Sequence, residues 1–374
     1  MRARATQGDS MDDCSRAIRK SGTQLAGMVA LLAATSVACA QFKVPGTVDS
    51  TVADAMRAQQ IPAVTVAMAK DDQLVYSKAF GTADLENAVP ATTDTLIRTA
   101  SIAKSITAVA AMTLVESGKL SLDVPVQTYC PPFPAKQWPI TVRELLAHTA
   151  GIRHYNDGEM ENTRHYKSLA DGFVLFAGDP LHFRPGTAYA YSTYGYTVVG
   201  CAIEGAAGER FQDYVAERVL KPAGMTHTVV DDVFEIVPHR ARGYQTLDGQ
   251  VRNASLMDSS YKIPGGGYVT TAEDLVRFAD ALMDGKLLKP GTVAQMWTAS
   301  AVSGKDGYGL GFQVRDGGRF VMHSGGQPGT STELLLIPRA HFAVAVLANM
   351  DGLHLLDLVR PILLNLQLPV PPPE

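Results

Sequence analysis

Ser101 and Lys104 lie three residues apart at the start of a long apolar stretch, and this spacing could turn the serine into a nucleophile. Residues three apart on a helix share a face, so the hydroxyl and the ammonium would point into the same space. Desolvation beside an apolar helix lowers the pKa of a lysine and makes its amine available as a proton acceptor. The helix N-terminus would add positive potential where an oxyanion forms. The pair is therefore a candidate activated serine.

The Ser-x-x-Lys pattern alone is weak, because a chain with this serine and lysine content should contain it about once by chance. A second copy occurs at Ser259 and Lys262, next to the turn-forming sequence at 263–267. No helix is expected there, so we interpret the second copy as accidental. The first copy is equally compatible with a capping serine and a solvated lysine, and other segments must decide between these interpretations.

Tyr191 lies on an expected turn just before a helix, where its phenol could face the same space. Beside a lysine, a phenol is pushed toward the phenolate and can exchange a proton with a serine or a leaving group. Several other tyrosines crowd this segment, and packing is the alternative role for any one of them.

A strand that ends in adjacent glycines is expected at His323, Ser324, Gly325 and Gly326. Glycines at a strand end allow a ligand to approach the backbone closely. The N–H of Gly326 could then complete an oxyanion hole with the N–H of Ser101. Without further context, the same pattern is typical of a tight strand end.

The helix that carries the first pair is expected over 102–115 and should end at Gly118. It is apolar on nearly every side, which predicts burial, and it is too short to cross a bilayer, which takes about 20 apolar residues. Thr141 and Glu144 form a capping box at the start of a shorter helix that ends near His148.

The pattern of the mature chain changes from strands to helices and back to strands. Strands are expected over 63–69 and 74–80, helices around 167–177, 194–207, 211–220, 271–283 and 290–298, strands over 308–314, 319–323, 332–337 and 342–347, and a last helix over 353–366. This order predicts an α/β (α+β) fold: an antiparallel-sheet lobe built from both chain ends, about 41–100 and 300–370, with an inserted helical lobe, about 101–299. A cleft between such lobes is a usual place for a site.

Composition narrows the possible functions. Of 374 residues, 46% are hydrophobic and 19% are charged, which is typical of a globular protein, and the formal net charge is −4. Nucleic acid is not an expected partner, because the sequence has no lysine or arginine cluster of the kind that follows phosphates. We expect a small-molecule or peptide substrate. No nucleotide-binding motif occurs, and no cofactor is expected.

The first 40 residues have the features of a cleaved leader. Basic residues precede an apolar run over 25–38, and small residues precede Gln41. We expect a signal peptide over 1–40, export to the periplasm or the cell exterior, and one mature domain over 41–374. The alternatives are acylation of Cys39 and an uncleaved membrane anchor, which the short apolar run disfavours.

Removal of this leader leaves two cysteines, Cys130 in a proline-rich turn and Cys201 in an expected buried helix. They could pair in an oxidising compartment, but two cysteines are far from a disulfide framework. We expect two buried free thiols, and neither lies near a histidine in a way that indicates nucleophilic chemistry.

Taken together, Ser101-Ile-Ala-Lys104, Tyr191-Ser-Thr193 and His323-Ser-Gly325 resemble, in order and rough spacing, the motifs of the serine β-lactamase-like superfamily. That superfamily includes class C β-lactamases, D-Ala-D-Ala carboxypeptidases, D-aminopeptidases and related esterases. The similarity covers about residues 61–349. Segments 152–155 and 191–196 are most similar to the mitochondrial serine β-lactamase-like protease branch and its bacterial relatives.

The resemblance implies a role for each matching residue. Ser101 would be the acyl-accepting nucleophile and Lys104 would help to deprotonate it. Tyr191 would pass the proton to the leaving group and help to activate the deacylating water. Thr193 and residues 323–326 would contact the substrate, and backbone N–H groups would hold the oxyanion. This constellation of nucleophile, proton acceptor and oxyanion donors needs no metal.

Two positions depart from the family pattern. Thr193 stands where an asparagine is usual, and a hydroxyl has a shorter reach and fewer donors than an amide. His323 stands where many members carry a lysine, so a fixed cation for a substrate carboxylate is missing and activity is expected to change in the histidine pH range. Both departures favour a peptidase or esterase with at most a weak β-lactamase activity.

Other hydrolase classes lack their signatures in this sequence. The Gly-x-Ser-x-Gly elbow of α/β-hydrolases is missing, and His148, His154 and His165 are too irregularly spaced for a zinc site. The remaining alternative is a catalytically weak binding or filament-forming scaffold protein with the same fold. The intact serine, lysine and tyrosine argue against that alternative.

Overall fold

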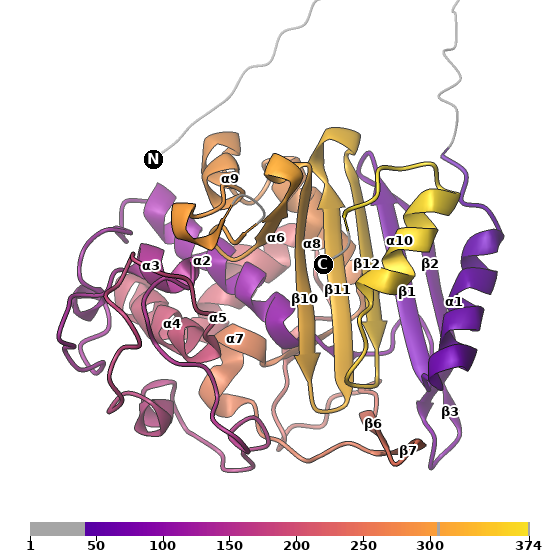
Figure 1. The fold of residues 1–374 in the computed structure, drawn as a ribbon, viewed down its shortest axis with the longest axis horizontal. Coiled ribbons are helices and arrows are strands. Elements are labelled where there is room, and N and C mark those ends of the chain that lie inside the picture. Colours follow the sequence, from indigo (N-terminus) through magenta and orange to yellow (C-terminus); the bar gives the residue numbers. More distant parts are fainter. Residues whose placement is uncertain (1–41, 305–306, 373–374) are drawn as a thin grey trace, which may run out of the picture. The chain divides into compact units, whose positions relative to one another are not determined.

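A seven-stranded sheet forms one half of the fold. A computed structural model of the chain describes residues 42–304 and 307–372, and the expected leader lies outside these residues. The strands are β1 Ala63–Lys70, β2 Gln73–Asp84, β3 Val89–Pro90, β9 Gln313–Arg315, β10 Phe320–Gln327, β11 Thr330–Ile337 and β12 Phe342–Ala348. Their order is β3-β2-β1-β12-β11-β10-β9 (Figure 1). β1 pairs with β12 antiparallel, which confirms a sheet built from both ends of the chain.

The sheet is buried on both faces because its strands alternate between two apolar clusters. On β12, Ala343 and Ala345 face one cluster, whereas Val344 and Val346 face the other. Helices α1 (Thr47–Gln59) and α10 (Leu356–Asn365) contribute to the second cluster and pack against each other. Helix α8 (Ala272–Met283) packs against β1 and β12 from the opposite face (Figure 1).

Helix α2 (Ala103–Glu116) is the centre of the other half of the fold. Every residue from Ala103 to Met112 is buried, as the apolar pattern predicted. A single 3-10 turn, η1 (Ala100–Ile102), precedes the helix and carries Ser101. Gly118 adopts a positive φ of 70°, which lets the chain turn away after the helix ends.

Apart from the 15-residue α4, the remaining elements are short, and most lie between β4 and β9 in the chain. They are β4 Ile97–Arg98, α3 Val142–Leu146, α4 Thr193–Ala207, α5 Phe211–Val215, α6 Lys221–Ala223, β5 Val229–Val230, β6 Tyr244–Leu247, β7 Gln250–Asn253, α7 Ile263–Gly266, β8 Tyr268–Thr270 and α9 Pro290–Met296. Helices α4 and α7 both pack against α2 and so enclose it. The capping box predicted at Thr141 and Glu144 begins α3.

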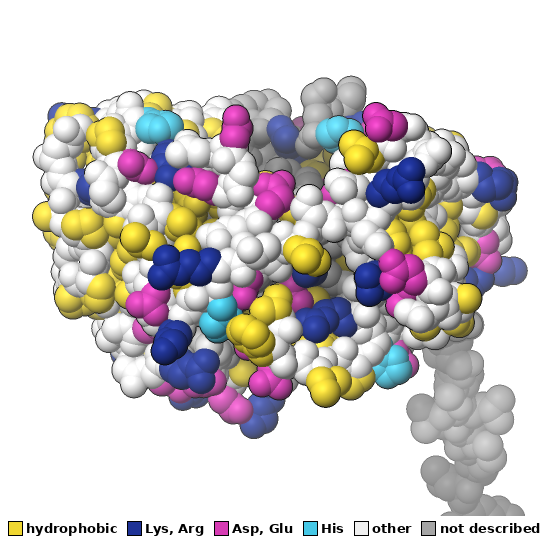
Figure 2. Space-filling model, turned by 90° about the horizontal axis from the view of Figure 1, so that it is seen from below, with side chains coloured by type: hydrophobic (Ala, Val, Ile, Leu, Met, Phe, Trp, Pro, Cys, Tyr) yellow, Lys and Arg dark blue, Asp and Glu magenta, His cyan; other side chains and the backbone are white. Residues whose placement is uncertain are grey.

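The surface carries charges of both signs. Basic and acidic side chains are interspersed over the face shown in Figure 2, and neither sign forms a continuous field there. None of the helices within residues 42–304 and 307–372 is long and apolar enough to span a membrane.

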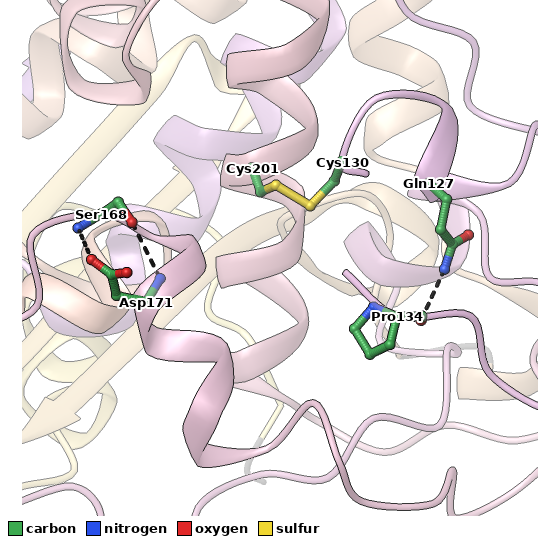
Figure 3. Close-up of a disulfide and its surroundings, with 6 residues drawn as sticks. All are labelled: Gln127, Cys130, Pro134, Ser168, Asp171 and Cys201. Atoms are coloured by element: carbon green, nitrogen blue, oxygen red, sulfur yellow. Dashed lines mark hydrogen bonds between the residues drawn. A yellow bond between two sulfur atoms is a disulfide. The ribbon is translucent and has the colours of Figure 1, made fainter. Parts of the chain in front are cut away.

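Three segments differ from the sequence prediction: 263–267, where no helix was expected and α7 forms, and the two that follow. Residues 167–177 form a 3-10 helix, Ala170–Leu175, rather than an α-helix. Ser168 and Asp171 exchange side-chain-to-backbone hydrogen bonds that hold a tight turn at its start (Figure 3). The strand expected over 308–314 shrinks to β9, because Gly311 has a positive φ of 84° and lies directly against α2.

Cys130 and Cys201 form a disulfide, so the prediction of two free thiols is wrong (Figure 3). Cys201 lies in α4 and Cys130 in a loop, with their Cα atoms 5.4 Å apart. The loop reaches α4 because Gly205 has no side chain: a Cβ there would lie 1.7 Å from the carbonyl oxygen of Tyr129. Gln127 donates to the carbonyl of Pro134 and steadies the same loop.

Removal of the disulfide is expected to destabilise the fold, because a crosslink over a separation of 71 residues restricts the unfolded chain. The Cys130→Ala/Cys201→Ala variant should lose about 2–4 kcal/mol of unfolding free energy in urea titrations. A reducing agent should destabilise the wild-type protein and leave the variant unchanged. A wild-type unfolding midpoint that does not respond to reduction would contradict the bridge.

Candidate functional site

Ser101 lies in a turn that places its hydroxyl next to Lys104. Ala100, immediately before it, has a positive φ of 44°, which is unusual for a residue with a side chain. Lys104 Nζ lies 3.0 Å from Ser101 Oγ and donates to the carbonyl oxygen of Gly265 at 2.8 Å. The carbonyl on α7 therefore fixes the lysine amine beside the serine hydroxyl.

Lys104 is completely buried, with 0% of its surface exposed. Burial lowers its pKa well below the usual lysine value, and the nearby charge of Lys262 lowers it further. The direction of this shift is the one that the sequence predicted. A neutral amine with a free lone pair can accept the proton of Ser101.

Tyr191 lies beside the same amine. The Nζ of Lys104 is 4.8 Å from the centre of the Tyr191 ring, and the phenol lies within hydrogen-bonding reach of Ser101. Burial raises the pKa of Tyr191 above its usual value, and the bond to Ser101 only partly opposes this. The prediction that Lys104 pushes this phenol toward the phenolate is therefore wrong. Burial, the largest influence on this phenol, disfavours the phenolate.

His148 positions the segment that carries Tyr191. Its carbonyl accepts from the N–H of Ala190, and its Nδ1 accepts from the N–H of Ser192 at 3.1 Å. The rings of His148 and Tyr191 lie 4.2 Å apart. Ser192 in turn donates to the carbonyl of Arg153 and caps α4. The backbone on both sides of Tyr191 is therefore fixed by one histidine.

Thr193 is held by three neighbours at the start of α4. Its N–H donates to Nδ1 of His154 at 3.2 Å, and its side chain lies near the Tyr155 phenol. Its methyl group packs on Gly265, where an added Cβ would lie 2.5 Å from it. Burial, together with nearby positive charge, lowers the pKa of His154 to about 4.

Gly325 and Gly326 have different effects on β10. A Cβ on Gly325 would lie 2.8 Å from the carbonyl oxygen of Thr99 and 2.9 Å from the Cβ of Ala100, so this glycine lets η1 pack on the strand. A Cβ on Gly326 would meet nothing within 4 Å. β9 pairs only with Phe320–Met322, so the rest of this strand edge lies beyond it. Open space beside β10 is therefore found at Gly326, whereas Gly325 allows the turn that carries Ser101 to pack closely on the strand.

His323 faces Tyr308. Its Nε2 lies 2.8 Å from the Tyr308 hydroxyl, and its Nδ1 lies 2.7 Å from the carbonyl oxygen of Ser324. Since a carbonyl only accepts, Nδ1 carries the proton and Nε2 accepts from the phenol. Burial, aided by the charge of Lys104, lowers the pKa of His323 to about 3. The expectation that His323 changes activity in the ordinary histidine range is therefore wrong.

Lys262 lies close to this site, which corrects the interpretation of the second Ser-x-x-Lys copy as an accident of a loop. Ser260–Lys262 form a 3-10 turn, η5, that leads into α7. Lys262 is 1% exposed, and its Nζ lies 5.4 Å from the centre of the Tyr155 ring. Ser259 is also buried, and its hydroxyl has no hydrogen-bond partner among the described residues.

Sequence reasoning missed His148, His154 and Tyr155 as parts of the site. Their only signal was their position in the segment after the capped helix α3, which was singled out for its resemblance rather than for its chemistry. In the described part of the chain, no group of three or more His, Cys, Asp or Glu side chains is placed to hold a metal ion.

Comparison with known proteins places the chain among serine hydrolases. The beta-lactamase family profile matches residues 48–367. The serine beta-lactamase-like protein LACTB of Homo sapiens, a mitochondrial protein, is 29% identical over 380 residues, which cover 74% of this chain and 69% of LACTB. The putative penicillin-binding protein PbpX of Bacillus subtilis is 31% identical over 253 residues, which cover 68% of this chain and 62% of PbpX.

A solved structure shows the same arrangement of the chain. The crystal structure of D-amino acid amidase from Ochrobactrum anthropi SV3, complexed with L-phenylalanine amide, superposes with a TM-score of 0.74 at 25% sequence identity. The superposition covers 86% of this chain and 99% of the amidase.

Burial of neutral histidines predicts a fold that is sensitive to acid. His154 and His323 have pKa values of about 4 and about 3, below the ordinary value near 6.5. At a pH between the lowered pKa and the ordinary pKa, these histidines bind protons in the unfolded chain but not in the native state. The free energy of unfolding should therefore be greatest above about pH 6.5 and decrease as the pH falls toward about 4. Urea titrations at about pH 7 and about pH 5 measure the difference, which should be smaller in His154→Gln. If the unfolding free energy changes equally between the two pH values in His154→Gln and in the wild type, His154 does not contribute to the acid sensitivity.

Proposed function

The chain belongs to the beta-lactamase family of serine hydrolases, and from this we propose that it cleaves an amide or ester bond through an acyl-enzyme formed on Ser101. The observation that best supports the proposal is the 3.0 Å contact between Ser101 Oγ and the buried Nζ of Lys104. A desolvated amine of lowered pKa next to a serine hydroxyl is an established way to activate the nucleophile. No cofactor is needed for this step.

Acylation begins when the hydroxyl proton of Ser101 passes to the neutral amine of Lys104. Ser101 Oγ bonds to the substrate carbonyl carbon, and the N–H groups of Ser101 and Gly326 stabilise the oxyanion. The Tyr191 phenol then gives its proton to the leaving nitrogen or oxygen as the scissile bond breaks. The Lys104 ammonium returns a proton to the Tyr191 oxygen, so both groups end neutral and Ser101 carries the acyl group.

Deacylation uses the same groups with water as the nucleophile. Water attacks the acyl carbon as its proton passes to the Tyr191 oxygen, while the phenol gives its own proton to the neutral Lys104 amine. That proton returns to Ser101 Oγ when the acyl bond breaks. The neutral phenol of Tyr191 suits this relay, because it can give a proton in one step and regain it in the next.

The substrate class follows from the neutral surroundings of the site. His323 is uncharged and bound to Tyr308, so it offers no cation to a substrate carboxylate. Thr193 lacks the amide with which an asparagine would contact a substrate. We propose a peptide, amino acid amide or ester without a carboxylate beside the scissile bond, with β-lactam hydrolysis weak at most. The superposed amidase is named for substrates of the amide type.

Export is part of the proposal. The leader-like composition of residues 1–40 supports it, and so does the disulfide between Cys130 and Cys201, because disulfides persist in oxidising compartments. The mature enzyme would act in the periplasm or outside the cell.

Labelling of the purified protein with a fluorescent fluorophosphonate or penicillin tests the nucleophile. Ser101→Ala should abolish labelling and lower kcat/KM on a responsive substrate by at least about 1000-fold, since the oxygen that forms the bond is gone. Ser259→Ala is the matched control, because the Ser259 hydroxyl has no hydrogen-bond partner in the described part of the chain. Labelling that survives Ser101→Ala would refute the assignment.

His323→Lys tests the substrate class. A lysine would place a cation where the neutral imidazole lies, so kcat/KM for a substrate with a carboxylate next to the scissile bond should rise about tenfold relative to its amide. His323→Gln keeps the position neutral and should leave this ratio unchanged. If His323→Lys also leaves the ratio unchanged, residue 323 does not contact a substrate anion.

A further inference from the structure

A second buried lysine lies next to the site and belongs to none of the three motifs. Lys262 ends η5, three residues before Gly265, whose carbonyl holds the Lys104 amine. Only 1% of its surface is exposed. The short segment 262–265 therefore contributes both the carbonyl that fixes the proton acceptor and a second ammonium close to it.

A continuous set of aromatic rings connects the two lysines. Lys104 Nζ lies 4.8 Å from the centre of the Tyr191 ring, which is 5.4 Å from the ring of His154. His154 is 4.3 Å from Tyr155, and Lys262 Nζ lies 5.4 Å from the centre of that ring. Aromatic rings screen charge far less than water does, so the two amines act on each other across them.

The charged groups around Lys262 compensate it only in part. Within the described residues Lys262 forms no ion pair; the charges that act on it are Arg98, Asp231 and Glu161. Asp231 already binds Arg98 at 2.6 Å and Arg240 at 3.1 Å, so its charge is shared.

The uncharged groups that face Lys262 are tyrosines and a histidine. Burial raises the pKa values of Tyr155 and Tyr261 and lowers that of His154, so all three are neutral near pH 7. Lys262 is the group of this cluster whose pKa lies near 7.

We propose that Lys262 is a positioning residue that keeps the Lys104 amine unprotonated by electrostatic repulsion. Two ammonium groups in one buried site disfavour each other, so a proton on Lys262 opposes a proton on Lys104. Lys262 thereby supplies the second positive charge that the neutral His323 does not. The inference rests on the proposed function, in which Lys104 accepts the proton of Ser101.

The pH range of this effect follows from the state of Lys262. Burial, then the charge of Arg98, lowers the pKa of Lys262 to about 7, while Asp231 and Glu161 raise it. Below that pH most Lys262 side chains are charged, and the repulsion acts where Lys104 would otherwise be protonated. The effect is therefore strongest on the acidic side of the pH profile.

Titration of Lys104 by NMR tests the proposal without turnover. The protein is labelled with [ε-13C]lysine, and the Lys104 resonance is assigned with Lys104→Arg. In Lys262→Met the apparent pKa of Lys104 should rise by about one pH unit, and in Lys262→Arg, which keeps the charge, it should stay near the wild-type value. An unchanged titration of Lys104 in Lys262→Met would overturn the proposal.

The pH dependence of kcat/KM, or of probe labelling, gives a second readout. The acidic limb should move to higher pH by the same amount in Lys262→Met and not in Lys262→Arg. A merely structural role would lower the rate at every pH together with the melting temperature, which would also overturn the proposal. Lys262→Gln serves both measurements if the methionine variant does not fold. Failure of wild-type labelling would refute the proposed function alone, because the titration needs no turnover.

Discussion

The hydrogen bond from Lys104 to the carbonyl of Gly265 is the contact on which the site depends. Burial without a counter-ion favours the neutral form of a lysine, and the neutral amine then needs a fixed partner. The partner is available because α7 lies tightly between α2 and α4. Thr107 donates to the carbonyl of Pro264, and a Cβ on Gly200 would lie 2.3 Å from the Pro264 ring. Helix packing therefore fixes the position of the Lys104 amine.

Around that contact, the site is built from groups whose charged forms are excluded. His148 and His323 are buried and His154 is half-buried; all three have lowered pKa values, and the phenol of Tyr191 has a raised one. Proton transfer between neutral partners creates charge only transiently, and dipoles already oriented in the site can stabilise it. The same neutrality explains why a histidine at position 323 cannot stand in for a lysine.

The features that the sequence revealed are those set by local pattern. Alternation predicted β1 and β2, apolar continuity predicted the burial of α2, and helical spacing predicted that Ser101 and Lys104 meet. The features that it did not reveal depend on distant parts of the chain. The disulfide needs a loop to approach α4 at Gly205, and the orientation of His323 depends on Tyr308. The sequence pattern around Tyr191 does not reveal how deeply its phenol is buried. That burial raises the pKa of Tyr191, whereas the sequence had predicted a lowered pKa.

The pairing of β1 with β12 has a consequence for biosynthesis. The N–H of Ala63 donates to the side chain of Asn349, across 286 residues of sequence, and the whole of β1 lies beside β12. Contacts of such high sequence separation form slowly, because a long loop must close first. A nascent chain that lacks its last strands exposes an unpaired, apolar β1 edge that invites aggregation. This architecture therefore delays completion of the sheet until β12 has left the ribosome.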